Sequence, residues 1–128
     1  TRREVKLLAQ RREHFEYLLV GRAPSREDFL HYLQLEMNLE MLLRVRSKAG
    51  RGAKLSPASV AVRKRVHYIF DRAVRRFKED ELMWLQWIDY AERTGAHTKL
   101  ARVFARALAL HPTNSRMWTR AAAWEMEG

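Results

Sequence analysis

The sequence predicts an all-α fold, a solenoid of antiparallel helix pairs, from three observations. Trp84, Trp87 and Tyr90 stand three residues apart, and Trp118, Ala121 and Trp124 repeat that spacing 34 residues later. The segment 70–73 recurs at 104–107 with the same offset. Five Gly and three Pro lie mostly where helices would end, and no segment alternates as a strand does. A period near 34 residues is typical of stacked helix pairs.

The first segment, residues 1–22, is predicted to be one leading amphipathic helix over 2–20. Its apolar stripe is interrupted by Arg12, and Gly21 is expected to end the helix in the left-handed conformation. Ala23-Pro24 then breaks the chain. Ser25 and Asp28 approximate a capping box, which predicts a helix over 26–46.

The remainder, residues 23–128, is predicted to hold repeats at about 25–78 and 80–112, and the first helix of a third at 114–128. Residues 47–58 are interpreted as a basic insert loop because they hold two Gly, small residues and three bases. Helices are expected over 58–78, with Pro57 in the first turn, over 81–93, from His97 or Thr98 to Leu110, and after an Asn114 or Ser115 cap. The chain begins without Met and stops inside a repeat, so we expect a fragment whose last helix exposes an apolar face.

The net charge of +10 is unevenly distributed along the chain. Residues 44–78 carry twelve Lys/Arg against one acid, whereas residues 79–92 carry five acids and no base. This asymmetry indicates a polyanionic or acidic partner, RNA phosphate or an acidic protein, with a merely solvated face as the alternative. The candidate contact residues are the bases that do not recur with the repeat: Lys48, Arg51, Lys54, Arg63, Lys64, Arg65, Arg75 and Arg76.

The repeating aromatic residues are expected to be buried between paired helices, although a base-stacking platform is the alternative. Arg72 and Arg106 occupy the same repeat position, which predicts a structural partner such as Glu36 or an acid of the adjacent helix. His67 and Asp71, four apart, are a weak metal signal, and no phosphate-binding or nucleophile motif occurs. We therefore expect no enzyme, no metal, no cofactor and no small-molecule substrate. There is no apolar run of membrane-spanning length and no cysteine.

The helix pairs resemble HAT (half-a-TPR) repeats, which occur in RNA-processing proteins. Departures are Leu35 for an aromatic residue, Ala91 for an acid and Ala105 for an acid. The matching first-helix positions are Phe29, Tyr32, Glu36, Trp84, Trp87, Tyr90, Trp118, Trp124 and Glu125, and the matching second-helix positions are Phe70, Asp71, Arg72, Ala73, Phe104, Arg106 and Ala107, followed by Pro112.

The segment from Arg12 to Glu127 also resembles a narrower family, the HAT-repeat subunits of the UTP-B subcomplex of the small-subunit processome. The blocks that carry this resemblance are Glu27-Asp28-Phe29, Leu110-His111-Pro112 and the stretch 118–127. It implies a right-handed alpha-alpha superhelix acting as a nucleolar scaffold for ribosome biogenesis and maturation of 18S rRNA. The implied partners are WD-repeat propeller subunits and the U-three snoRNA or pre-rRNA. A HAT scaffold of the spliceosome, of the crooked-neck type, and a direct RNA-binding module using residues 44–78 remain the alternatives.

Overall fold

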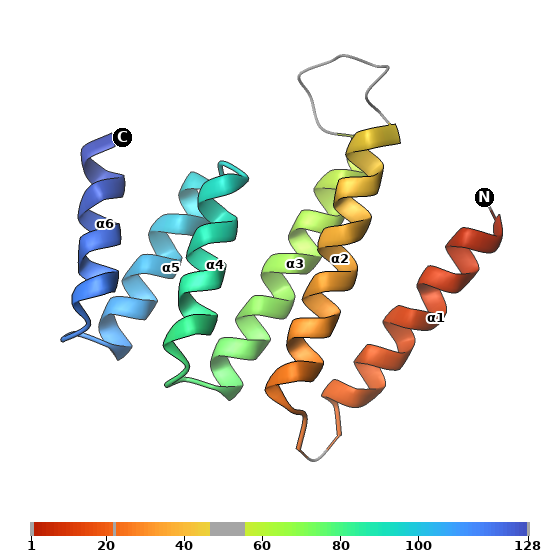
Figure 1. Ribbon diagram of the computed structural model, residues 1–128, viewed down its shortest axis with the longest axis horizontal. Coiled ribbons are helices and arrows are strands. Elements are labelled where there is room, and N and C mark those ends of the chain that lie inside the picture. Colours follow the sequence, from red (N-terminus) through yellow and green to blue (C-terminus); the bar gives the residue numbers. More distant parts are fainter. Residues whose placement is uncertain (1, 22, 47–55, 128) are drawn as a thin grey trace. The chain divides into compact units, whose positions relative to one another are not determined.

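The computed structural model describes residues 2–21, 23–46 and 56–127, and every regular element within these ranges is an α-helix (Figure 1). The all-α prediction is therefore confirmed. None of the helices in the described ranges has both the length and the apolar character needed to cross a membrane. The helices are α1 (Arg2–Leu19), α2 (Arg26–Arg46), α3 (Pro57–Arg76), α4 (Glu81–Arg93), α5 (His97–Leu110) and α6 (Ser115–Glu127).

The chain divides into two compact units, residues 1–73 and 74–128. In the first unit α1 packs on α2, and α3 contributes Val66 and Ile69, both fully buried. The rest of that core is Leu19, Phe29, Tyr32, Leu33, Val62, Phe70 and Ala73. In the second unit α5 packs on α4 and on α6. Its core is Val74, Met83, Trp84, Trp87, Ile88, Tyr90, Ala91, Leu100, Val103, Phe104, Ala107 and Met117.

Burial of the repeat aromatics is confirmed on α2 and α4 but not on α6. Trp84, Trp87 and Tyr90 are at most 2% exposed, because the i, i+3, i+6 spacing places them on one helix face. Trp118, one period later, is 52% exposed, and Trp124 is half-buried against Phe104 at 5.6 Å between ring centroids. Within the described residues α6 packs against α5, and its outer side has no further helix to cover it.

The helices α2 and α6 start at predicted capping residues, and α4 starts at a cap that was not predicted. Ser25 and Asp28 form the predicted reciprocal capping box, with N–H···O distances of 3.1 and 2.9 Å. Asp80 accepts a hydrogen bond from the Met83 amide at 3.1 Å, and Asn114 does the same for Met117 at 3.1 Å. Each cap satisfies one of the amide groups that a helix start leaves without a partner. The Asp80 and Asn114 caps stand 34 residues apart, so the sequence period is repeated in the side-chain caps of the helices.

The helix boundaries differ from prediction for α1 and α3, whereas α4 ends at Arg93 as predicted. Gly95 adopts φ 68°, and the amide of Ala96 donates to the carbonyl of Ala91 at 3.0 Å, which is a glycine-terminated helix end. Gly21 was expected to do the same for α1. That expectation is wrong, since Gly95 is the glycine with positive φ in the described ranges. The third helix spans Pro57–Arg76 rather than 58–78, so the predicted insert 47–58 overlaps its first two residues; residues 47–55 lie outside the described residues.

Candidate interaction surfaces

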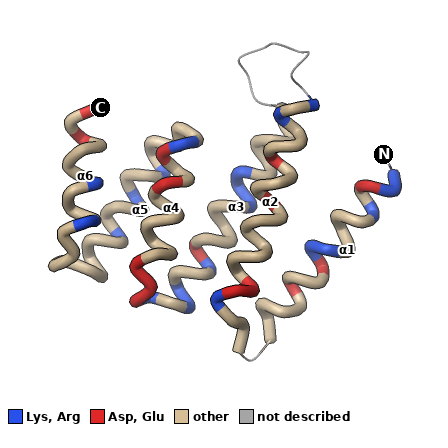
Figure 2. The backbone as a smooth tube through the Cα atoms, in the orientation of Figure 1, with Lys and Arg blue, Asp and Glu red and all other residues tan. Residues whose placement is uncertain are grey.

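The basic residues singled out in the sequence fall into three groups in the structure. Lys48, Arg51 and Lys54 lie outside the described residues. Arg63 and Arg65 are half-buried and bonded to α2, whereas Lys64 between them is exposed. In the second unit, Arg75 and Arg76 at the end of α3 are exposed. Figure 2 shows Lys and Arg positions along α3, including its C-terminal end.

Arg63 and Arg65 face inward because α2 offers them oxygen acceptors. Arg63 pairs with Glu40, whose side chain is 5% exposed. Arg65 donates to the Tyr32 hydroxyl at 3.0 Å. A nearly buried carboxylate is costly unless a cation is hydrogen-bonded to it, so these arginines have a structural role in the fold. They are poor candidates for phosphate contact.

The same polar layer continues from α2 to α1. Arg12 donates two hydrogen bonds, both 2.7 Å, to the carboxylate of Glu36, which is fully buried. The Tyr32 hydroxyl donates to Glu16 at 2.8 Å, and Arg72 donates to both Glu16 oxygens at 3.0 Å. Three helices are therefore joined by polar bonds in a layer that is largely shielded from water. A two-point arginine–carboxylate pair also fixes the relative orientation of its helices.

Sequence reasoning missed this layer although a signal was present. Arg12 was read only as an interruption of the apolar stripe on α1. Arg12 and Glu16 are four residues apart, as are Glu36 and Glu40, so each pair lies on one helix face. When such charges lie on the core-facing sides of two helices and have opposite signs, they indicate ion pairs between the helices.

The environment shifts two titrating groups in this layer. Burial, together with the hydrogen bond to Glu16, raises the pKa of Tyr32 to about 12. The hydrogen bonds to Glu36 raise the pKa of the Arg12 guanidinium. At the exposed end of α1, the hydrogen bonds from Arg46 lower the pKa of Glu4 to about 2.

Both recurring arginines have structural partners, as predicted, but the acid that pairs with Arg72 is not Glu36. Glu36 is bonded to Arg12, and Arg72 pairs with Glu16 of α1 instead. In the second unit Arg106 lies over the rings of Trp84 and Trp87, at 5.5 Å from each centroid. A guanidinium over an aromatic face is stabilised by the ring's quadrupole, so Trp84 and Trp87 are aromatic partners of Arg106.

The outer face of α3 in the first unit combines a cation with an aromatic ring. Tyr68 is 56% exposed, and the Arg72 guanidinium lies 5.1 Å from its centroid. Lys64, one turn before Tyr68, is exposed and has no hydrogen bond or ion pair with the described residues. We call Lys64 and Tyr68 the α3 outer face.

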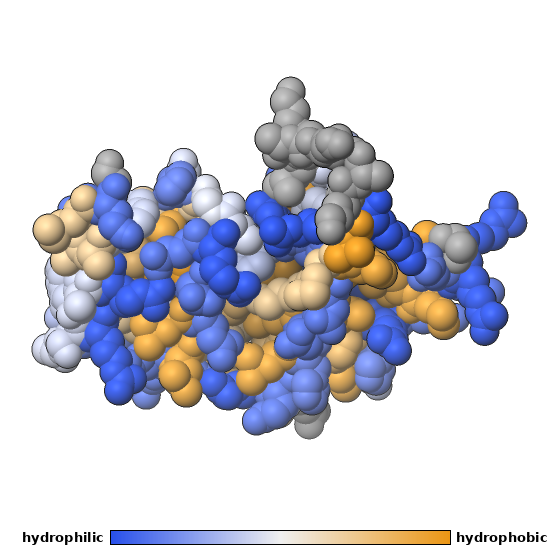
Figure 3. All heavy atoms as spheres, turned by 45° about the horizontal axis from the view of Figure 1, so that its top comes forward, coloured by the Kyte–Doolittle hydropathy of each residue, from blue (hydrophilic) through white to orange (hydrophobic). Residues whose placement is uncertain are grey.

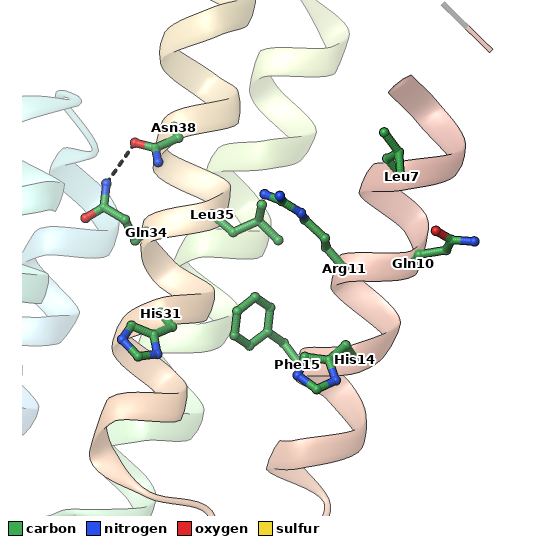
Figure 4. A pocket seen from close by; sticks show the side chains of 9 residues that line it. All are labelled: Leu7, Gln10, Arg11, His14, Phe15, His31, Gln34, Leu35 and Asn38. Carbon is green, nitrogen blue, oxygen red and sulfur yellow. Dashed lines mark hydrogen bonds between the residues drawn. The ribbon is translucent and has the colours of Figure 1, made fainter. Parts of the chain in front are cut away.

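A second surface is an open groove of about 580 Å³ between α1 and α2 (Figure 4). Phe15 projects from α1 toward α2, Leu35 projects from α2 toward α1, and the Arg11 side chain extends across the gap (Figure 4). Hydrophobic side chains are open at the surface over these two helices (Figure 3). The residues lining this α1–α2 groove are Leu7, Gln10, Arg11, His14, Phe15, His31, Gln34, Leu35 and Asn38.

The described ranges contain no group of three or more His, Cys, Asp or Glu side chains placed to hold a metal ion. His67, half of the weak metal signal, is 7% exposed in the core of the first unit. The fold and the surfaces above define the class of the molecule, which is an all-α protein of packed helices. Its surfaces are the α3 outer face and the α1–α2 groove, and a polar layer joins α1, α2 and α3.

Comparison with known proteins identifies the family within that class. A family model described as U3 small nucleolar RNA-associated protein 6 matches residues 1–76. The U3 small nucleolar RNA-associated protein 6 homolog of Homo sapiens is 33% identical over 125 residues, covering 97% of this chain and 21% of its own length. The Schizosaccharomyces pombe protein is also 33% identical, covering 97% of this chain and 26% of its own length. The Dictyostelium discoideum homolog is 25% identical over 127 residues, covering 99% of this chain and 21% of its own.

The chain belongs to the family of U3 small nucleolar RNA-associated protein 6. It spans about a fifth to a quarter of the length of these relatives.

Proposed function

We propose that this chain is part of a non-catalytic scaffold subunit of the U3 snoRNP and small-subunit processome, acting in nucleolar ribosome biogenesis and pre-18S rRNA processing. The observation that carries the proposal is the family match over residues 1–76, extended by relatives named for U3 small nucleolar RNA association over 97% of the chain. A spliceosomal scaffold of the crooked-neck type has no comparable support. The partners of the scaffold would be other processome subunits, including WD-repeat propeller proteins.

We also propose that the chain forms part of a right-handed HAT-repeat superhelix. The supporting contacts recur with the 34-residue period. The Trp84 indole donates to the Lys78 carbonyl at 3.2 Å, and the Trp118 indole donates to the Pro112 carbonyl at 2.7 Å. Both indoles reach six residues back to the loop before their own helix. Stacked repeats would present long surfaces for docking, which is what a scaffold requires.

The scaffold proposal is tested by purifying the tagged full-length protein and probing the RNA that accompanies it. We expect U3 small nucleolar RNA and propeller subunits, and accumulation of unprocessed 18S precursor when the protein is depleted. An untagged strain is the control. Recovery of spliceosomal small nuclear RNA in place of U3 would refute the proposal.

A second candidate function is direct RNA contact through the α3 outer face. The supporting observation is the exposed Tyr68 ring one helical turn from Lys64, a cation without an ion pair among the residues that the structure describes. An exposed aromatic ring can stack on a base, while a nearby lysine contacts phosphate. Arg75 and Arg76 remain candidates in the second unit, and Lys48, Arg51 and Lys54 lie outside the described residues.

The RNA candidate is tested with Lys64→Glu and Tyr68→Ala in the full-length protein. Because both side chains are exposed, we expect RNA affinity to fall severalfold with little change in stability. Lys99→Glu, at an exposed position of α5, is the matched control. Arg63→Glu is unsuitable as a probe, since it places a second carboxylate beside Glu40. RNA affinity that is unchanged by Lys64→Glu and does not depend on salt would refute direct contact by this face.

A further inference from the structure

The α1–α2 groove has the architecture of a site for a helix. Its lining residues are Leu7, Gln10, Arg11, His14 and Phe15 on α1, and His31, Gln34, Leu35 and Asn38 on α2. The α2 set follows the spacing i, i+3, i+4, i+7, and the α1 set follows the same spacing with Phe15 added at i+8, so each comes from one face of its helix. Two parallel ridges with apolar side chains between them are the arrangement into which an amphipathic helix docks.

The floor of the groove is apolar. On α2, the helix face that lines the groove continues beyond the lining residues. Leu7, which lines the groove on α1, is 51% exposed. On α2, steps of about 100° per residue place Met41, Leu42 and Val45 on the face that carries Leu35 and Asn38. These three are 65%, 44% and 63% exposed. The lined section and this extension together offer exposed apolar area over roughly four helical turns.

The charge of the groove is one-sided. Arg11, His14 and His31 are among its nine lining residues, and no carboxylate is. Within the described residues Arg11 and His31 make no hydrogen bond or ion pair. On the inner side of the same helices the carboxylates Glu16, Glu36 and Glu40 are engaged by arginines. The groove therefore presents an unneutralised cation beside an apolar floor.

We propose that the α1–α2 groove binds an amphipathic helix of another protein, with Leu-type residues facing the floor and Asp or Glu facing Arg11. This inference rests on the proposed scaffold function and names the chemistry of one partner. Charge complementarity selects an acidic segment. RNA fits less well, because Leu7, Leu35 and Met41 offer nothing to a phosphate backbone. A second copy fits less well too, because in an isologous contact a groove lined by cations and by no carboxylate would meet a surface of the same sign.

The test places a photo-crosslinking p-benzoylphenylalanine at His31 in the full-length protein inside cells. His31 is exposed and lines the groove. Ala9, exposed on α1 but outside the lining, is the matched control position. We expect the His31 position, and not Ala9, to crosslink to a protein segment with apolar residues at helical spacing and a net negative charge.

That segment, made as a synthetic peptide, is then titrated against the full-length protein. The Arg11→Glu change removes one attractive charge contact and adds a repulsive one. We therefore expect it to weaken peptide binding about tenfold. Lys6→Glu, exposed on the same helix but outside the lining, should change the affinity by less than about twofold. Met41→Glu tests the apolar extension and should also weaken binding.

Four results would overturn the inference: crosslinking to RNA, crosslinking to a second copy, crosslinking to a segment without acidic amphipathic character, and no yield above the Ala9 position. Equal affinity of the Arg11→Glu and Lys6→Glu proteins would overturn it as well. U3 small nucleolar RNA is measured in the same purifications. Its absence would count against the scaffold proposal, whereas failure of the crosslink with U3 present would count only against the groove.

Discussion

Replacing the Arg12 side chain should lower the free energy of unfolding far more than its partly exposed position on α1 suggests. The Arg12 side chain is 26% exposed, whereas Glu36, which receives both of its hydrogen bonds, is fully buried. Arg12→Met leaves a buried carboxylate without its cation, which costs about 3–5 kcal/mol. Glu36→Gln leaves a guanidinium that can turn toward water, so the loss is about 1–2 kcal/mol. The two partners of one ion pair are therefore expected to differ by about 2 kcal/mol.

Urea denaturation of the chain at neutral pH, followed by circular dichroism, measures these differences. Arg11→Met, at the exposed and unpaired neighbouring position, is the matched control and should stay within about 0.5 kcal/mol. The double change Arg12→Met with Glu36→Leu removes both charges and should recover part of the loss. The reasoning is refuted if Arg12→Met costs no more than Glu36→Gln, or if the double variant is less stable than Arg12→Met alone.

Three further predictions concern other parts of the structure. Trp84→Ala should cost about 3–5 kcal/mol in urea denaturation because the ring is fully buried, whereas Trp118→Ala, 52% exposed, should cost about 1 kcal/mol; equal costs would contradict the observed burial. Because the pKa of Tyr32 is raised to about 12, its contribution to stability is complete below about pH 10 and is lost as pH rises through about 12. Stability measured from pH 9 to 12 should fall less steeply for Tyr32→Phe, and parallel curves would exclude Tyr32 as the cause. Gly95→Ala should cost about 1 kcal/mol from backbone strain alone, since no atom lies within 4 Å of an added Cβ, and Gly95→Asn should cost less.

The helices could be predicted from the sequence because their signals are local. The ranges predicted for α2 and α4 match the structure residue for residue, and each begins with a side-chain cap, at Ser25 and Asp80. The predicted end of α1 was less accurate. Gly21 follows the helix without adopting a positive φ, so a glycine after a helix does not by itself establish a left-handed cap.

The groove and the polar layer could not be predicted in the same way, because both depend on which residues of different helices meet. Arg12 and Glu36 are separated by 24 residues, and Arg72 and Glu16 by 56. Helical periodicity places a residue on a face of its own helix but does not give the register of one helix against another. The exposure of Trp118 likewise depends on what packs against α6, and the repeat period carries no information about that.

The charge of α3 shows why composition alone assigns too much to nucleic acid. Arg63, Lys64 and Arg65 are consecutive, and in the sequence they form one basic block. Steps of about 100° send them to different sides of the helix, so Arg63 reaches Glu40, Arg65 reaches Tyr32 and Lys64 faces outward. Two of the three charges thus stabilise the packing of α2 against α3. A basic segment in a helical protein therefore indicates an anionic partner only to the extent that its charges lie on the outer face. In the first unit Lys64 beside Tyr68 on α3 and Arg11 in the α1–α2 groove meet that condition, as do the exposed Arg2, Arg3 and Lys6 on α1.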